Sequence, residues 1–432
     1  MTLRVLDRIN LYNSGLLSFY LGIFLLFSAP AIAVIFFLIS LIISLKYLKR
    51  NPFKDKINII LLVITFLMLF SCISYQLFNN TYDFQNNFEK YTHPLISLFN
   101  WIPLFFSFFG FQFYLSNKEK RKFAGIALIS GTIPVLVSGI GQYIFNWYGP
   151  FEAFNGFIIW YQRSNQLGLT SLFNNQNYAG CALATAWPFF FAAFFNKKIN
   201  FSWRFIAFFL NIVVVLSIFF TTSRNSIISL IFGFIILLIP IKFKNIFAGI
   251  ISFLSIIFFS LYSKFIFNLT PSINNITIFK KFNYENLISD PRLNIWRSSF
   301  KYIFKKPFLG WGGNSFSSIW NHENNYMYLH SHSLPLELSI QYGIFTTFAF
   351  TLIIIFLFHR SFKKIFFDNK NNLITFGMDN HFERAWFASS VAILFSNTID
   401  ILYFDLRISI LMWILLAGLR SIIREKEIIY EI

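Results

Sequence analysis

Long apolar runs separated by short polar segments make up most of the chain. A membrane-spanning helix needs about 20 consecutive apolar residues, and about twelve runs approach that length. The pattern predicts an all-α fold, a polytopic membrane helical bundle of about 12 transmembrane helices with one large extracytoplasmic loop. The spans are expected at 15–29, 31–47, 57–76, 94–115, 124–146, 177–195, 204–221, 225–241, 246–267, 333–358, 384–400 and 402–419.

The apolar pattern divides the chain into three regions. Residues 1–267 hold transmembrane helices 1–9, residues 268–332 form a large periplasmic loop, and residues 333–432 hold helices 10–12 and a cytoplasmic tail. Within the loop, apolar and basic residues interleave from Asp290 to Lys306, which predicts an amphipathic helix at the membrane interface. The glycines that follow, in Gly310-Trp311-Gly312-Gly313, predict a tight turn.

Charge gives the orientation of these helices. The formal net charge is +18, but the basic residues form short clusters between the apolar runs and make no continuous stripe, so we expect no nucleic-acid partner. Basic clusters collect on the cytoplasmic side of a membrane. Applied to this chain, the rule predicts a multi-pass membrane protein with both termini cytoplasmic. Proline residues at 134 and 188 lie inside predicted spans, yet no central pair of ionisable residues accompanies them, which argues against a transporter.

Arg224 is the first candidate for chemistry. It lies in Thr221-Thr222-Ser223-Arg224-Asn225-Ser226, a short turn between two apolar runs on the extracytoplasmic side. An arginine this close to hydrocarbon pairs with a carboxylate, extends to the interface or binds an anionic ligand. An interfacial anchor and an anion-binding group fit the sequence about equally well.

Arg292 is the second candidate, because Asp290 and Pro291 mark a helix start and place it in the first turn. Its guanidinium, together with the backbone N–H groups of that turn, is suited to phosphate oxygens. The alternative is an ordinary arginine on the face of an amphipathic helix.

His330 and His332 lie just before the span that begins near Leu334. An imidazole can accept a proton from a hydroxyl near neutral pH, so either is a candidate general base. A polar turn that caps the following helix is the simpler interpretation, and zinc is less favoured because no cluster of acidic or cysteine residues completes a ligand set nearby.

Acidic residues are sparse in the 268–332 loop, where only Glu285, Asp290 and Glu323 occur. No paired carboxylate motif indicates a divalent metal, so we expect arginine to hold any bound phosphate and expect no metal and no cofactor. Asp400, Asp405 and Arg407, near the last extracytoplasmic turn, are expected to form a structural ion pair.

These motifs together resemble the O-antigen ligase and O-antigen polymerase superfamily of membrane glycosyltransferases. His332-Ser333, nine intervening residues, Gly343 and then Thr346 reproduce the family's histidine motif. The glycine-rich turn that begins at Gly310 looks like another family motif, as do Thr222-Ser223-Arg224, Arg292-Leu293-Asn294-Ile295-Trp296 and the Asn-rich stretch 174–179.

The resemblance implies a lipopolysaccharide-type reaction at the outer face of the bacterial inner (plasma) membrane. A glycan would pass from a polyprenyl diphosphate, such as undecaprenyl diphosphate, to a lipid or glycan acceptor by an inverting, metal-independent mechanism. Arg224 and Arg292 would hold the pyrophosphate, His332 would be the base, and His330 would assist it. Many members carry Glu where this chain has Gln341, so any carboxylate role there would pass to Glu337 or be missing.

The sequence leaves the acceptor open. A ligase would use lipid A-core or a similar acceptor, and a polymerase of the same superfamily would use a second lipid-linked repeat unit. Both use the same donor chemistry, and the loops 77–93 and 147–176 carry no recognisable code for the acceptor.

Overall fold

The computed structural model of the chain describes residues 2–47, 55–78, 94–164, 168–196, 200–238, 290–324, 328–367 and 381–428. The predicted all-α class is confirmed, since one short antiparallel hairpin, β1 (Phe151–Ala153) with β2 (Ile158–Trp160), is the only sheet among these residues. The first helices are α1 (Thr2–Leu25), α2 (Pro30–Tyr47), α3 (Lys56–Phe78), η3 (Pro94–Asn100), α4 (Ile102–Phe111), η4 (Gln112–Leu115) and α5 (Lys118–Ile144). The others are α6 (Gln176–Phe195), α7 (Phe201–Phe220), α8 (Arg224–Leu238), α12 (Pro291–Lys305), α13 (Ser315–Asn324), α14 (Leu334–Phe366), α15 (His381–Ile399) and α16 (Leu406–Ile428).

The chain is a multi-pass membrane protein. Among the described residues, eight helices are long and apolar enough to cross a bilayer: Pro30–Tyr47, Lys56–Leu77, Pro94–Leu115, Lys118–Ile144, Gln176–Phe195, Phe201–Phe220, Leu334–Phe366 and Leu406–Glu425. Helix α8 is apolar but shorter, and α1 and α15 occupy two further predicted spans without meeting the same criterion. The predicted span 246–267, and with it the division between residues 267 and 268, lies outside the described residues.

Local sequence signals set where several helices begin. Pro30 opens α2 directly after a short turn, so α1 and α2 form the hairpin that a proline at a helix start favours. The side chains of Asn117, Asn175 and Asp290 accept hydrogen bonds from the first backbone N–H groups of α5, α6 and α12. Each of these N-caps satisfies a donor that has no partner within its helix.

The centre of the bundle is α6, which packs against α7, α8 and α15. Small residues allow these helices to approach closely, as is common between helices in membranes. A Cβ on Gly180 would lie 2.2 Å from the Ser226 Oγ atom, so α6 and α8 meet at a glycine. The close approach brings the first residues of α6 and α8 beside the end of α15.

Buried ion pairs join the helix ends that carry the basic clusters. Arg121 of α5 lies 2.8 Å from Glu383 of α15 and 3.0 Å from Glu425 of α16, and Arg420 lies 2.7 Å from Asp55, just before α3. These pairs neutralise charge that would be costly to bury alone. The opposite ends of α15 and α16 therefore belong to the other side of the bundle.

Helix α14 is interrupted at Gly343, whose φ of 84° lies in a region that favours glycine. The interruption frees backbone groups, and the glycine-rich turn binds them. Trp311 N donates to the Ile340 carbonyl at 2.7 Å, and Ile344 N donates to the Pro307 carbonyl at 2.8 Å. A Cβ on Gly343 would lie 2.0 Å from the Phe308 carbonyl oxygen, and one on Gly310 would lie 2.5 Å from the Ile340 carbonyl oxygen. The two glycines therefore allow the backbone of the glycine-rich turn to pack directly on the backbone of α14.

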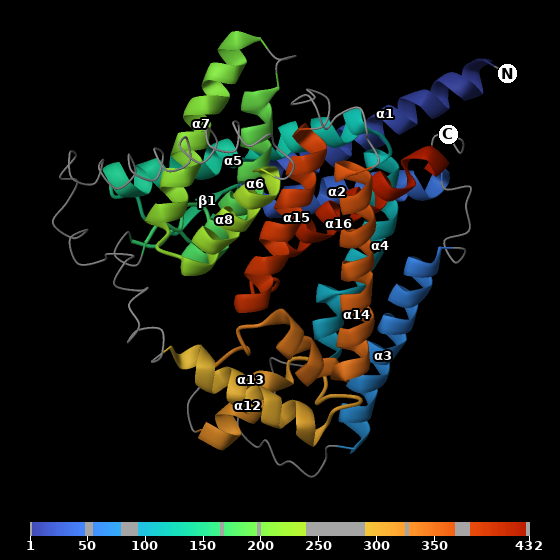
Figure 1. Ribbon diagram of the computed structural model, residues 1–432, viewed down its shortest axis with the longest axis vertical. Helices are drawn as coiled ribbons and strands as arrows, with labels where there is room; N and C mark the ends of the chain where they lie inside the picture. The colour runs from blue at the N-terminus through green and yellow to red at the C-terminus, as the bar shows by residue number, and fades with distance from the viewer. Residues whose placement is uncertain are drawn as a thin grey trace.

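This contact fixes the segment before α14 at one end of the bundle. Figure 1 shows α12 and α13 beside the lower ends of α3 and α14, below the end of α15. A second hydrophobic cluster, which includes Ile295, Tyr302, Trp311 and Trp320, joins α12 and α13 to the start of α14.

Candidate functional site

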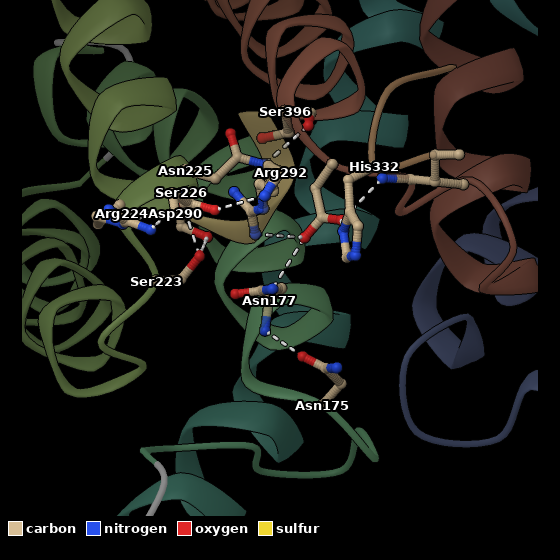
Figure 2. Close-up of polar contacts among 12 residues, drawn as sticks. Asn175, Asn177, Ser223, Arg224, Asn225, Ser226, Asp290, Arg292, His332 and Ser396 are labelled. Carbon is tan, nitrogen blue, oxygen red and sulfur yellow. Dashed lines mark hydrogen bonds and ion pairs between the residues drawn. The ribbon is translucent and has the colours of Figure 1, made fainter. Parts of the chain in front are cut away.

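The buried carboxylate of Asp400, in the turn after α15, connects three other elements, which carry the Asn177, Arg292 and His332 side chains labelled in Figure 2. Its Oδ1 lies 2.8 Å from the Nδ1 atom of His332, which precedes α14. Its Oδ2 accepts a hydrogen bond from the Asn177 side chain of α6 at 2.9 Å and from the Arg292 guanidinium of α12 at 3.4 Å. Two of the residues singled out in the sequence, Arg292 and His332, therefore meet on one carboxylate.

The surroundings of Asp400 keep it ionised. Burial alone would raise the pKa of its carboxyl group, but the hydrogen bond with His332 and the positive charge of Arg292 outweigh burial and hold the pKa below its usual value. A carboxylate that accepts hydrogen bonds and faces a cation is stabilised in its charged form. Asp400 is thus an acceptor at neutral pH, and the Nδ1 atom of His332 carries the proton between them.

His332 has a backbone conformation that non-glycine residues seldom adopt, with a φ of 54°. The turn around it is held by Glu337, a buried carboxylate in the first turn of α14. Glu337 Oε2 accepts the backbone N–H of Ser331 at 2.8 Å, and its Oε1 accepts the side-chain amide of Gln341 at 2.7 Å. The carboxylate in this region is therefore Glu337, and Gln341 is its partner.

His330 lies beside His332, with 4.4 Å between the ring centroids. Burial, followed by the nearby charges of His332 and Arg292, lowers the pKa of His330 from 6.5 to about 4. Its Nδ1 atom is buried and has no hydrogen-bond partner among the described residues. His330 is consequently a neutral imidazole at pH 7.

Arg224, the first residue of α8, forms an ion pair with Asp290, the N-cap of α12. The other oxygen of Asp290 accepts the backbone N–H of Arg292 at 3.0 Å. That finding corrects one expectation, because the N–H of Arg292 is already bound and is not directed at a phosphate. The two arginine side chains keep 24% and 22% of their surface exposed, so both are accessible to a ligand.

Small polar residues attach the start of α8 to α15. The side-chain amide of Asn225 donates to the Ser396 carbonyl at 2.7 Å, and the hydroxyls of Ser229 and Ser396 lie 2.7 Å apart. The Ser226 hydroxyl donates to that of Ser223 at 3.0 Å (Figure 2). These contacts fix the backbone that carries Arg224 relative to Asp400.

The expected ion pair at the last extracytoplasmic turn is present only in part. Asp405 pairs with Arg407, whose Nε lies 2.9 Å from Oδ1, and the guanidinium also lies 3.8 Å from the centre of the Phe173 ring. Asp400 takes no part in this pair, so its assignment to a structural ion pair was wrong. An ionisable residue at the end of an apolar run often has a functional role, and this feature of the sequence could have made Asp400 a candidate site residue.

Asp400 is the acidic residue that the sequence around His330 and His332 lacked. The ligand atoms of His330, His332 and Asp400 lie within 4.8 Å of one another, a set that by residue type suits a metal ion. The Arg292 guanidinium, 3.4 Å from Asp400, opposes a second cation there by charge repulsion. Two of the three groups, His332 and Asp400, also form a hydrogen-bonded histidine–carboxylate pair.

Residues 206–351 match the family model described as O-antigen ligase. The matched segment includes Arg224, Arg292, His330 and His332, whereas Asn177 and Asp400 lie outside it. None of the curated proteins compared with the chain matches it. The match confirms the resemblance that the histidine, arginine and glycine motifs indicated.

Proposed function

We propose that this chain, as a member of the O-antigen ligase superfamily, moves a glycan from a polyprenyl-diphosphate carrier to the hydroxyl of lipid A-core or a similar acceptor. Its family is one of membrane glycosyltransferases, and the donor, acceptor and site are our assignments. The observation that carries the proposal is the set of contacts linking Arg224, Arg292 and His332 through Asp290 and Asp400. Such a site has both a proton acceptor and cations for a diphosphate.

His332 is the proposed general base. Its Nδ1–H donates to Asp400, which leaves the Nε2 atom with a lone pair for the proton of the acceptor hydroxyl. The Asp400 carboxylate then stabilises the imidazolium that forms, as the carboxylate does in an Asp-His pair of a hydrolase. The side chain of His332 keeps 22% of its surface exposed, which allows a substrate to approach it.

Arg224 and Arg292 are the proposed diphosphate ligands. A guanidinium donates two parallel hydrogen bonds to phosphate oxygens and keeps its charge at any relevant pH. In the structure both arginines face carboxylates, Asp290 and Asp400. These carboxylates orient the guanidinium groups before the donor binds, and the exposed part of each side chain remains for the phosphates.

The proposed reaction is a single displacement at the anomeric carbon of the donor sugar. The acceptor oxygen forms a bond to this carbon while the bond from the carbon to the diphosphate oxygen breaks. The electron pair leaves with the diphosphate, whose growing charge the two arginines stabilise, and the hydroxyl proton passes to His332. Attack from the side opposite the leaving group inverts the configuration.

His330 is the proposed neighbour that assists the base, and no metal or cofactor is assigned a step. A neutral imidazole beside His332 donates or accepts a hydrogen bond without adding charge to the site. We assign stabilisation of the leaving group to the two arginines, and to His330 the orientation of the acceptor.

We place the site at the periplasmic face of the bacterial inner membrane, with both termini in the cytoplasm. The support is positional: the ends of α14 and α15 that carry basic residues lie opposite the ends next to His332 and Asp400, and Asn177 joins Asp400 from the start of α6. Basic clusters mark the cytoplasmic side.

A chromosomal deletion tests the function. Loss of a ligase leaves complete polymer on the lipid carrier and none on the acceptor at the cell surface. Loss of a polymerase of the same superfamily leaves a single repeat unit attached to the acceptor. Unchanged surface and carrier-linked glycan in the deletion strain would reject both assignments.

A further inference from the structure

Helix α12 has one face that packs on the protein and one that does not. Ile295, Ser299, Tyr302 and Ile303 are buried against the cluster that contains Trp311 and Trp320. The opposite face, which we call the α12 outer face, consists of Leu293, Arg297, Phe300, Lys301 and Phe304. These positions recur three and four residues apart, so they share one side of the helix.

Large aromatic side chains are exposed on this face. Phe300 is 53% exposed and Phe304 is 79% exposed. Exposed apolar groups of this size, grouped on one side of a helix, indicate a partner that removes them from water.

The α12 outer face is continuous with the apolar surface of α14. Phe308, just after α12, stacks on Phe345 of α14 with 5.6 Å between ring centroids, and both rings are exposed. From Phe345 the exposed apolar residues Phe348, Leu352 and Ile355 continue along α14, a helix apolar enough to span the bilayer. The surface of α12 therefore joins one that acyl chains cover.

The two cations on this face are available to an external anion. Lys305, on the same helix, is engaged by Glu323 at 2.8 Å, and Lys306 lies over the Trp311 ring. No ion pair within the described ranges involves Arg297 or Lys301. Burial alone would raise the pKa of the Glu323 carboxyl group, but the hydrogen bond and charge of Lys305, and after them the charge of Lys301, help to hold this pKa below its usual value. On the helix they lie beside the exposed phenylalanines, the arrangement in which basic groups reach phosphates while apolar groups enter the acyl layer.

We propose that the α12 outer face docks on the lipid leaflet at the site end of the bundle and binds anionic phospholipid head groups. Phe300 and Phe304 enter the boundary between head groups and acyl chains, and Arg297 and Lys301 bind lipid phosphates. Figure 1 agrees with this orientation, since α12 runs across the direction of α14. The inference holds whichever reaction the site performs.

The docking has a consequence for the site. Arg292 is in the first turn of α12, and Asp290, its N-cap, pairs with Arg224. A helix fixed in the plane of the head groups sets both arginines at the depth of lipid phosphates. A diphosphate at the head of a lipid carrier occupies the same depth.

The test uses the full chain in nanodiscs and needs no enzymatic activity. An environment-sensitive fluorophore is attached to a Phe304→Cys variant, and the protein without that substitution gives the background from the buried Cys72 and Cys181. Nanodiscs of phosphatidylcholine are compared with nanodiscs that also contain phosphatidylglycerol. Quenching by spin-labelled acyl chains reports insertion, and quenching by aqueous iodide reports exposure to water.

We expect acyl-chain quenching to increase when phosphatidylglycerol is present. In an Arg297→Gln/Lys301→Gln background the increase is lost, because the two charges together favour the membrane-docked state of α12 over the undocked state by ~30-fold on an anionic surface. Lys118→Gln/Lys122→Gln, at the other end of the bundle, is the matched control and keeps the response. Should the Phe304→Cys protein fail to insert, the same label at Phe300→Cys gives the same readout.

Strong iodide quenching in both lipid compositions would overturn the docking, because the face would then meet water or a soluble partner. Acyl-chain quenching that is equal with and without phosphatidylglycerol would overturn the assignment of anionic head groups as the ligand. Loss of transfer activity with a normal quenching response would count against the proposed function and leave this inference standing.

Discussion

The Oδ1 atom of Asp400 lies 2.8 Å from the Nδ1 atom of His332, although 68 residues separate them in the chain. The other carboxylate oxygen lies 3.4 Å from Arg292. One buried side chain therefore orients the proposed base and one of the proposed phosphate ligands. This relationship makes Asp400 the first residue to test.

Asp400→Asn should reduce transfer ~10²–10⁴-fold, the range expected when a base loses its orientation or its proton affinity. The measurement is glycan transfer by purified protein from a lipid-linked donor, with His332→Ala expected to fall by a similar factor. Asp405→Asn is the matched control, because Asp405 pairs with Arg407 and not with the site. Equal losses in the two aspartate variants would remove the special role of Asp400.

Arg224→Lys and Arg292→Lys should each lower transfer ~10–100-fold, since lysine keeps the charge but loses the two parallel hydrogen bonds of a guanidinium. The effect should fall on kcat as well as on the donor KM, because the arginines stabilise charge that develops in the transition state. Steady-state kinetics with varied donor concentration separate the two. A lysine variant with wild-type kinetics would exclude that arginine from the diphosphate site.

Chelation by EDTA should leave transfer unchanged, because the two arginines are assigned the charge that a metal would otherwise neutralise. The assay compares chelated protein with protein supplied with Mg²⁺ or Zn²⁺. Activity that disappears on chelation and returns with a metal would instead assign His330, His332 and Asp400 as its ligands.

Glu337→Gln should lower kcat ~10-fold with little change in the donor KM. Glutamine can still accept the Ser331 N–H, but its own amide then faces the amide of Gln341, and a buried donor left unpaired costs ~1–3 kcal/mol. The exchange Glu337→Gln/Gln341→Glu restores one donor and one acceptor between the two positions. We expect it to recover most of the activity, and an exchange variant no better than Glu337→Gln would contradict this account of the turn.

Acid should destabilise the protein through His330. Its pKa is lowered on folding from 6.5 to about 4, so the unfolded chain binds more protons in this range and stability falls as the pH drops from about 6.5 to about 4. Each pKa unit corresponds to ~1.4 kcal/mol. His330→Gln should flatten the dependence of the unfolding temperature on pH between 7 and 5, measured in detergent, and a slope equal to wild type would show that His330 does not contribute.

The sequence alone determined the helical class and most helix positions, and the reason is the bilayer. Backbone groups in hydrocarbon need internal partners, so an apolar run of sufficient length has to form a helix. Local signals were equally direct: Pro30 starts α2 and Asp290 caps α12, because each acts on backbone groups a few residues away. The motifs at Arg224, Arg292 and His332 were also visible in the sequence, and they indicated the family whose model matches residues 206–351.

Only the tertiary structure decided how these motifs meet. The partner of His332 is Asp400, which follows a different helix, and the sequence had assigned that aspartate to a neighbouring arginine because nearby charges of opposite sign usually pair. Asn177 joins the same carboxylate from α6. The interruption of α14 at Gly343 is likewise explained only by tertiary structure, because the backbone of Pro307–Gly312 forms hydrogen bonds with the backbone groups that the interruption leaves unpaired. Spacing along a chain reports contacts within a helix or a turn, whereas contacts between helices depend on packing that no short stretch of sequence encodes.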